Sequence, residues 1–237
     1  MGFLFEFPNR PHRRDMLIDR IWWDVDPDRA RRSFNTVLWR LRKLLGISEL
    51  ERKCTRILGS KHEVFLELAS STWVDTVAFR ESLSDLSAGQ AMDRSAETLI
   101  PRLFDAFRTY RGPFMDGESA DWIIEERERL HSLYVRTGTQ LVRLLGGDGC
   151  YADAIDIAKQ ILLADPYREG LHCDLVLLLI ANGQRAEAIQ IQESMEKRLR
   201  SELGIAPMPE TSALAEMIKT NAIFDKLDGL MASRWSR

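Results

Sequence analysis

The sequence is poor in the residues that build disulfide frameworks and metal sites. Its 237 residues include only three cysteines and four histidines. Cys54, Cys150 and Cys173 form no CxxC pair, which indicates reduced thiols. The histidines are scattered as well, and the adjacent His172 and Cys173 would point to different sides of a helix. We therefore expect neither a disulfide framework nor a metal site.

Long apolar runs and the loops typical of cofactor binding are missing too. No run is long enough to span a membrane. The opening residues are not typical of a signal peptide, because their positive charge follows the apolar residues. Glycine-rich loops of the P-loop or Rossmann type are absent, and no Ser-His-Asp or Cys-His arrangement can be argued from spacing. The sequence therefore predicts a cytoplasmic protein that is no enzyme and has no cofactor.

Neither sign of charge dominates the whole chain, but the two ends differ. The formal net charge is -3. Residues 1–70 contain 14 Lys and Arg against 10 Asp and Glu, a net charge of +4, and the remainder carries -7. A basic head on an acidic body permits nucleic-acid binding by the head without requiring it. The length suits one large domain or two ordinary ones.

The strongest pattern is a basic amphipathic helix between Asp28 and Gly46. Apolar residues recur along it at helical spacing, at Ala30, Phe34, Leu38, Leu41 and Leu45. Its other faces are polar and mostly basic, with Arg29, Arg31, Arg32, Asn35, Thr36, Arg40, Arg42 and Lys43. A helix buried on one side and rich in Arg and Asn on the other suits the major groove of DNA.

The flanking segments predict a small α+β domain. Residues 13–23 have apolar residues at helical spacing, and Pro27 marks the turn before the basic helix. Residues 56–68 predict a β-hairpin, with a turn at Gly59–Lys61 and alternating Val64, Leu66 and Leu68. Helix, turn, helix, hairpin is the order of a winged helix-turn-helix after its first helix, although a generic α+β domain could share it.

Beyond residue 77 the pattern is helical almost throughout. It predicts helices over residues 77–86, 95–110, 119–145, 151–164, 168–182, 186–203 and 210–221. Tyr151–Ile155 is echoed 34 residues later by Arg185–Ile189, which is the tetratricopeptide period. Stacked helix pairs leave a concave surface that binds a peptide, another protein or a second copy, or that only packs against the first domain.

These motifs follow one another in a defined order between residues 17 and 207. They are Leu17–Trp22, Ala30–Phe34, Arg40–Gly46, Arg111–Phe114, Trp122, Glu126–Arg127, Arg129–Leu130, Asp165–Glu169, Asn182–Ala188 and Glu202–Pro207. In this order the chain resembles the bacterial transcriptional activator domain family, which includes the Streptomyces antibiotic regulatory proteins.

The resemblance implies a mainly α fold with two domains. Residues 1–70 would form a truncated winged helix-turn-helix with a small β-hairpin wing, residues 71–222 a tetratricopeptide-like helical domain, and residues 223–237 a C-terminal tail. Residues 13–23 would be the positioning helix, residues 29–45 the recognition helix and residues 56–68 the wing. The implied function is sequence-specific DNA binding in a transcription regulator.

The DNA-binding residues implied in this way are Arg29, Arg31, Arg32, Asn35, Thr36, Trp39, Arg40, Lys43 and Lys61. Asn35 could pair bidentately with adenine, and arginines could read guanine. Arg42, Lys43 and Lys61 are expected at phosphates. For each of these residues, a solvated helix face is the competing interpretation.

The chain departs from the family pattern at two places. The family's opening strands are missing, and residues 2–7 match only the end of its first helix, so we expect exposed apolar surface around Phe3, Phe5 and Phe7. A shortened or misassigned start, a covering second copy, or a natural loss of DNA binding would each account for this. Trp39 stands where members often have a small polar residue, and it could be an interface anchor or pack under the wing.

Three function classes remain open. The first is a homodimeric transcription regulator on double-stranded DNA, with RNA polymerase or another protein as a further partner and the helical domain for dimerisation or effector sensing. The second is a protein-interaction or signalling module with a vestigial head. The third is a small-molecule receptor, for example for a nucleotide, with the ligand between the domains or in the helical concavity. No membrane partner is expected.

Overall fold

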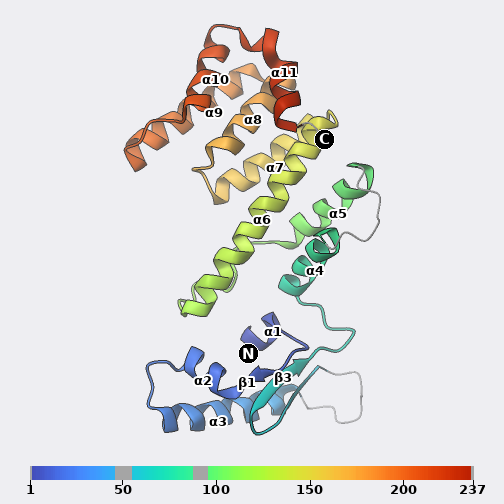
Figure 1. Cartoon of the computed structure of the whole chain (residues 1–237), viewed down its shortest axis with the longest axis vertical. Coiled ribbons are helices and arrows are strands. Elements are labelled where there is room, and N and C mark those ends of the chain that lie inside the picture. The colour runs from blue at the N-terminus through green and yellow to red at the C-terminus, as the bar shows by residue number, and fades with distance from the viewer. Residues whose placement is uncertain (1, 46–54, 88–95, 236–237) are drawn as a thin grey trace. The chain divides into compact units, whose positions relative to one another are not determined.

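The computed structural model describes residues 2–45, 55–87 and 96–235. The fold is mainly helical with one small sheet, as predicted (Figure 1). It separates into two compact units. Unit 1 comprises residues 1–84 and 109–130, and unit 2 comprises residues 85–108 and 131–237. No helix of the described residues is long and apolar enough to cross a membrane.

Unit 1 begins with a short helix, a helix pair and a three-stranded antiparallel sheet. Its elements are α1 (Gly2–Glu6), β1 (His12–Arg13), α2 (Arg14–Ile21), α3 (Pro27–Leu45), β2 (Arg56–Gly59), β3 (Glu63–Glu67), α4 (Asp75–Ser87) and the first turns of α6 (Asp121–Gly147). The strand order is β1-β3-β2. The predicted hairpin is confirmed, and β1, which pairs His12 with Val64, is an addition to it.

The core of unit 1 is formed where α1, α2, α3, the hairpin and the start of α6 meet. Val64 and Leu66 alternate inward from β3 and are at most 1% exposed. Phe3 is 7% exposed and meets Trp122 of α6 edge to face, with ring centroids 5.1 Å apart. The expected exposure of Phe3, Phe5 and Phe7 is therefore wrong, because α6 covers Phe3, and Phe5 and Phe7 are partly buried against the same core.

A buried ion cluster links α1, α4 and α6 within unit 1. The fully buried side chain of Glu6 pairs with Arg80 of α4, and Arg80 also reaches Glu126 of α6 at 3.4 Å. Arg129 hydrogen-bonds Glu126 through Nε at 2.9 Å. Burial and the neighbouring Glu126 raise the pKa of Glu6 to about 7, because two carboxylates share one poorly hydrated site.

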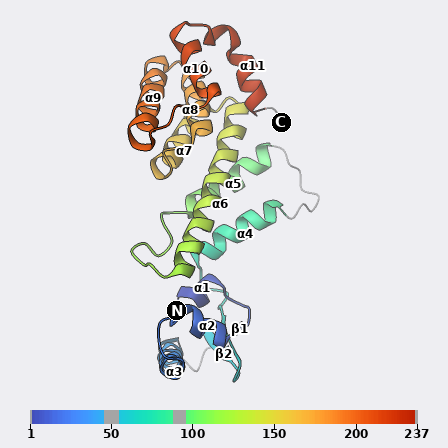
Figure 2. The same ribbon diagram turned by 60° about the vertical axis from the view of Figure 1, so that its left-hand side comes forward.

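Unit 2 is an array of antiparallel helices. It contains α5 (Ala96–Thr109), the rest of α6, α7 (Tyr151–Ala164), α8 (Glu169–Ala181), α9 (Arg185–Arg198), a π-helical turn (Leu199–Leu203), α10 (Pro209–Lys219) and α11 (Ile223–Trp235) (Figure 2). The echoed alanines Ala154 and Ala188 are both fully buried, which lets α7 and α9 pack closely against neighbouring helices. The helix predicted to end at Leu203 ends at Arg198, and the chain reaches Gly204 through the π-helical turn.

The C-terminal residues assigned to a tail form α11, so that part of the predicted division is wrong. Arg234 donates from Nε to Asp174 of α8 at 2.6 Å, and the side chain of Asp174 is only 1% exposed. Trp235 is buried against Gly146, where an added Cβ would come within 3.0 Å of the indole ring. Helix α11 has little hydrophobic periodicity, but the ion pair of Arg234 and the indole of Trp235 attach it to the neighbouring helices.

The described cysteines are free thiols. Cys150 is exposed and Cys173 is buried, while Cys54 lies outside the described residues. Burial raises the pKa of the Cys173 thiol, so this sulfur is an unreactive part of the α8 core. No group of three or more potential metal ligands occurs among the residues that the structure describes.

Candidate nucleic-acid interface

Helix α3 is initiated by its own sequence. Asp26 accepts a hydrogen bond from the backbone of Arg29 at 3.0 Å, which caps the helix, and Pro27 occupies the first turn. Ala30, Phe34 and Leu38 face the core and are between 1% and 6% exposed. The predicted stripe is thereby confirmed. The predicted helix end at Gly46 lies outside the described residues.

The opposite face of α3 is exposed and basic. All eight predicted positions on this helix are exposed, namely Arg29, Arg31, Arg32, Asn35, Thr36, Trp39, Arg40 and Lys43. By helical spacing, Arg32, Thr36, Trp39 and Lys43 form the ridge opposite the core. Among the described residues, Arg31 is the only one of these cations with an ion-pair partner, Asp28 at 3.6 Å. The face therefore presents several positive charges without compensating carboxylates.

Trp39 belongs to this outer ridge and not to the core. It is 61% exposed, and the ammonium of Lys43 lies 5.3 Å from its ring centroid. The alternative that Trp39 packs under the wing is therefore wrong. Thr36 donates its hydroxyl to the carbonyl of Arg32 at 2.9 Å, so its methyl group and oxygen lone pairs remain for an outside partner.

The wing is a tight hairpin whose turn carries Lys61. The hydroxyl of Ser60 accepts hydrogen bonds from the backbone of His62 and of Glu63, at 3.1 and 3.2 Å. Gly59 is required by close approach, because an added Cβ would lie 2.5 Å from the carbonyl oxygen of Glu63. Lys61 is exposed in this turn, as expected for a phosphate contact. Arg42 turns instead toward the wing and donates to the carbonyl of Ile57 at 3.3 Å.

Arg14, which the sequence pattern does not single out, joins the three parts of this surface. Its guanidinium donates to Oδ1 of Asn35 on α3 and to the carbonyl of Ser60 in the wing turn, the latter at 3.2 Å. It also lies over the ring of Phe34, 5.1 Å from the centroid. The only signal in the sequence was a basic residue at the start of the predicted positioning helix, which no periodicity distinguishes from its neighbour Arg13.

An apolar groove of about 160 Å³ lies on the flank of α3 that is away from the wing. It is lined by Phe3, Leu4, Leu17, Ile21, Trp22, Phe34, Val37, Leu38 and Leu41. Of these residues, Ile21 and Val37 are more than a third exposed, and Leu44, one helical turn beyond Leu41, is 65% exposed. The apolar surface expected around Phe3 is therefore present as this groove, although Phe3 itself is buried and most of the lining comes from α2 and α3.

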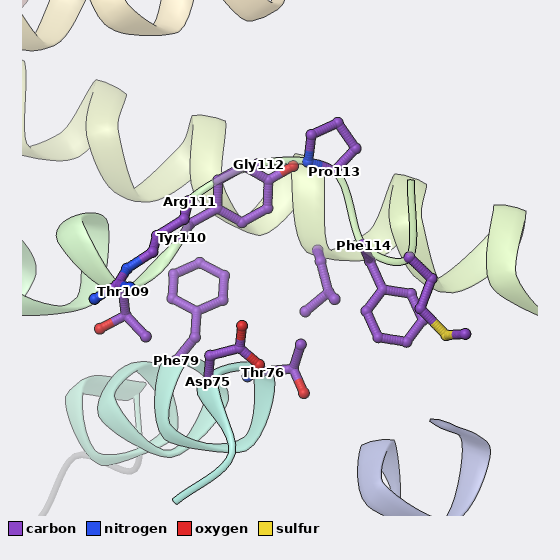
Figure 3. Close-up of a pocket in the computed structure, with 11 residues that line it drawn as sticks. Asp75, Thr76, Phe79, Thr109, Tyr110, Arg111, Gly112, Pro113 and Phe114 are labelled. Carbon is purple, nitrogen blue, oxygen red and sulfur yellow. Dashed lines mark hydrogen bonds between the residues drawn. The ribbon is translucent and has the colours of Figure 1, made fainter. Parts of the chain in front are cut away.

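A larger cavity of about 410 Å³ lies elsewhere in unit 1 (Figure 3). It is bounded by Asp75, Thr76 and Phe79 of α4, by the loop Thr109–Met115 and by Leu130. The rings of Phe79 and Tyr110 lie on one side with centroids 6.0 Å apart, and Arg111 comes from the loop above them. Burial raises the pKa of the Tyr110 phenol. The cavity thus combines aromatic walls with one carboxylate and one guanidinium.

Comparison with known protein families shows the family to which the chain belongs. A family model described as "Bacterial transcriptional activator domain" matches residues 74–219. The chain belongs to this family. The bacterial transcriptional activator domain family is one of transcriptional regulators and not of enzymes, as predicted. The match begins at α4 and continues to the end of α10.

Curated relatives extend the similarity into the head. The chain is 30% identical to the regulatory protein AfsR of Streptomyces griseus over 210 residues, which is 85% of this chain and 20% of AfsR. It is 25% identical to the transcriptional regulatory protein EmbR of Mycobacterium tuberculosis over 219 residues, which is 89% of this chain and 54% of EmbR. The chain therefore spans a fifth of AfsR and about half of EmbR.

A solved structure shows the same fold. Mycobacterium tuberculosis EmbR in complex with a low affinity phosphopeptide matches with a TM-score of 0.67 at 23% identity, over 97% of this chain and 61% of that chain. The likeness supports the predicted combination of a winged helix with a helical domain.

Proposed function

We propose that this chain is a cytoplasmic, sequence-specific DNA-binding regulator of transcription. Helix α3 enters the major groove, and Lys61 of the wing contacts the phosphate backbone. The observation that carries the proposal is the outer face of α3, where Arg29, Arg32, Arg40 and Lys43 are exposed and no ion pair among the described residues neutralises them. A helix with one buried stripe and a cationic outer face fits the groove in shape and in charge.

The roles within this face follow from position. Arg32 lies on the ridge opposite the core and is placed to reach base edges, whereas Arg29 and Arg40 lie on the flank and contact phosphates. Trp39 and Lys43 add an exposed aromatic ring and a further cation to the same face. Each arginine that reads a guanine contributes about 1–3 kcal/mol of discrimination.

The test is a salt titration of binding to a duplex obtained by selection from random DNA. We expect the logarithm of the association constant to fall steeply with the logarithm of salt concentration, because bound counterions are released from DNA. Replacing both Arg32 and Arg40 with alanine should weaken binding and reduce the magnitude of the slope by about 1, because Arg40 is the phosphate contact of the two.

Arg136→Ala with Arg143→Ala is the matched control. Both residues are exposed on the part of α6 that belongs to unit 2, and this double variant changes the net charge by the same amount. It should bind DNA like the unaltered protein. Weak binding with a flat salt dependence, unchanged by Arg32→Ala and Arg40→Ala, would contradict DNA recognition and favour an interaction module with a vestigial head.

We further infer that the protein binds DNA as a homodimer through the helical unit. A dimer on one face of DNA places its two recognition helices about one helical turn apart. Footprinting should then show two half-sites centred about 10 base pairs apart, and sedimentation should give twice the chain mass. A single half-site bound by one chain would contradict this part of the proposal. RNA polymerase would be a further partner once the dimer is on DNA.

Effector sensing is a second candidate function, and the cavity beside α4 favours it. Its volume of about 410 Å³ lies within the range of about 300–1,000 Å³ typical of small-molecule sites. Adenine nucleotides and small aromatic acids are suitable probes, because Arg111 supplies a cation beside Phe79 and Tyr110. A ligand should raise the melting temperature in proportion to the logarithm of its concentration, and Arg111→Ala should reduce the shift. An unchanged melting temperature for every probe would contradict this function for those ligands.

A further inference from the structure

Asn35 stands at the meeting point of α3, α2 and the wing, and its amide is held in one orientation. A guanidinium has donors only, so the atom of Asn35 that faces Arg14 must be the oxygen Oδ1. The identity of the neighbour therefore decides the direction in which the amide points. Its nitrogen Nδ2, with two hydrogens, is the end that Arg14 leaves unoccupied.

Arg14 is itself held from three sides and cannot easily move away. Its backbone N–H donates to the carbonyl of His62 at 2.9 Å, and its side chain donates to the carbonyl of Ser60 at 3.2 Å. The guanidinium lies over the ring of Phe34, which is 6% exposed in the core. The side chain of Arg14 is thus anchored to the wing turn and to the core side of α3. Its hydrogen bond therefore fixes the orientation of the Asn35 amide.

The pair consequently offers DNA a surface made of donors. Bidentate pairing of asparagine with adenine needs Oδ1 to accept from the adenine amino group while Nδ2 donates to N7. Here Oδ1 already accepts from a cation, and an incoming amino group would meet the guanidinium N–H groups at the same oxygen. Guanine presents only acceptors, O6 and N7, on its major-groove edge. The Nδ2 hydrogens of Asn35 and the remaining N–H groups of Arg14 suit those acceptors.

We propose that Arg14 sets the base preference of Asn35, so that this asparagine recognises guanine and not adenine. The inference rests on the proposed function, since it concerns which base α3 recognises once it lies in the groove. It replaces the adenine pairing that the residue type alone suggested. Arg14 acts as a specificity-determining residue through its hydrogen bond to Asn35.

The first experiment uses the unaltered protein and its selected duplex. Asn35→Ala identifies the base pair whose preference depends on Asn35, and we expect guanine there. Inosine at that position keeps O6 and N7 and should bind equally well, whereas 7-deazaguanine loses one acceptor and adenine loses O6. Each of the last two should weaken binding about 10-fold, and both effects should be smaller in Asn35→Ala, where only the N–H groups of Arg14 remain to meet the acceptors.

Two substitutions then test the role of Arg14. Asn35→Asp keeps an oxygen for Arg14 but replaces the two outward hydrogens by an acceptor, so the preference should change to cytosine or adenine, whose amino groups donate. Arg14→Met keeps an apolar stem over Phe34 and removes every donor, so guanine and adenine should become nearly equal at that position. Helical circular dichroism checks that Arg14→Met folds; if it does not, Asn35→Asp and the base analogues decide.

The failures of the two proposals are distinguishable. If no sequence is enriched from the random library, the proposed function itself fails. If a site is enriched but the Asn35-dependent base is adenine, or if Asn35→Ala changes no position, DNA recognition stands and the role of Arg14 is refuted. An unchanged guanine preference in folded Arg14→Met would also refute it.

Discussion

Helices α3 and α8 differ in how much of their surface is buried. Three of the 19 residues of α3 are buried, against 11 of the 13 residues of α8. The buried residues of α3 form one stripe, so the rest of its surface is available to a partner. The apolar residues of α8 lie all around the helix, which is typical of a central core helix. Unit 1 thus carries an exposed basic face on a surface helix, whereas α8 is the buried central helix of unit 2.

The polar residues of the two helices differ in the same sense. In α8, Glu169 accepts hydrogen bonds from the backbone of Met208 and the hydroxyl of Thr211, at 2.7 and 2.8 Å, and Asp174 pairs with Arg234. These side chains connect helices within unit 2. On α3 most of the cations have no such internal partner among the described residues. Internal partners indicate a structural role, and their absence over a basic face favours an external one.

The largest effect on stability should come from removing apolar volume in α8, the central helix of unit 2. Leu178 of α8 is fully buried, so Leu178→Ala should lower the free energy of unfolding by about 3–5 kcal/mol through lost burial and a residual cavity. Chemical denaturation measures the change. Leu163→Ala is the control, because Leu163 is 85% exposed and should change stability by no more than about 0.5 kcal/mol. Equal effects of the two substitutions would contradict the central position of α8.

Breaking the ion pair between α8 and α11 should have the next largest effect. Arg234→Ala leaves the buried carboxylate of Asp174 without its cation, but Arg234 is 31% exposed and water can partly replace it. We expect a loss of about 2 kcal/mol, below the full cost of breaking a buried pair. Arg234→Lys should recover part of that loss. A melting temperature unchanged by Arg234→Ala would show that α11 is not held through this contact.

In unit 1, the ionisation of Glu6 should make the free energy of unfolding depend on pH. Glu6 has a pKa raised from 4.5 to about 7 in the folded protein, so between these values the folded state holds a proton that the unfolded chain has released. The contribution of Glu6 to the free energy of unfolding is therefore fully present below pH 4.5. It is lost as the pH rises through 7, by on the order of 1 kcal/mol per pH unit. Glu126, with a lowered pKa, acts below this window.

The measurement is the unfolding free energy from pH 5 to pH 8. Glu6→Gln imitates the neutral acid and should remove the decrease that the unaltered protein shows. The control Glu210→Gln changes an exposed carboxylate on α10 and should leave the decrease in place. A decrease of equal size in Glu6→Gln would assign the pH dependence to another group.

The smallest effect on stability is expected on the outer face of α3. Arg32→Ala and Arg40→Ala remove exposed side chains without ion pairs among the described residues, so each should change the free energy of unfolding by less than about 0.5 kcal/mol. Denaturation and DNA binding measured on the same samples separate the two roles. A large loss of stability would show that this face is covered within the protein and not offered to DNA.

The sequence predicted the elements whose pattern is local. The stripe Ala30, Phe34, Leu38 repeats at helical spacing, the turn at Gly59–Lys61 carries hairpin residues, and the alanine echo at 154 and 188 marks helix pairs. Each of these signals lies within a few residues of the structure that it specifies. The end of α9 does not follow from the sequence, because the switch to a π-helical turn after Arg198 has no strong sequence signature.

The features that the sequence does not predict are contacts between residues that lie far apart along the chain. Phe3 is covered by Trp122 and β1 is recruited by β3, and α11 is held through Asp174. None of these partners lies nearby in the sequence, so no periodicity could reveal them. The same is true of the candidate interface, where the residues on α3 were found from their spacing but Arg14 was not, since its value depends on contacts with Asn35 and Ser60.

The sequence by itself determined which helix is basic on one side, where the wing turns and how the helix pairs repeat, because local propensity and hydrophobic spacing act over one or two turns. Only the tertiary structure decided what those side chains can offer. It left Trp39 on the surface, buried Glu6 beside a second carboxylate, and brought the guanidinium of Arg14 to the oxygen of Asn35. Hydrogen-bond orientation and desolvation depend on neighbours in space, and the folded chain alone supplies those neighbours.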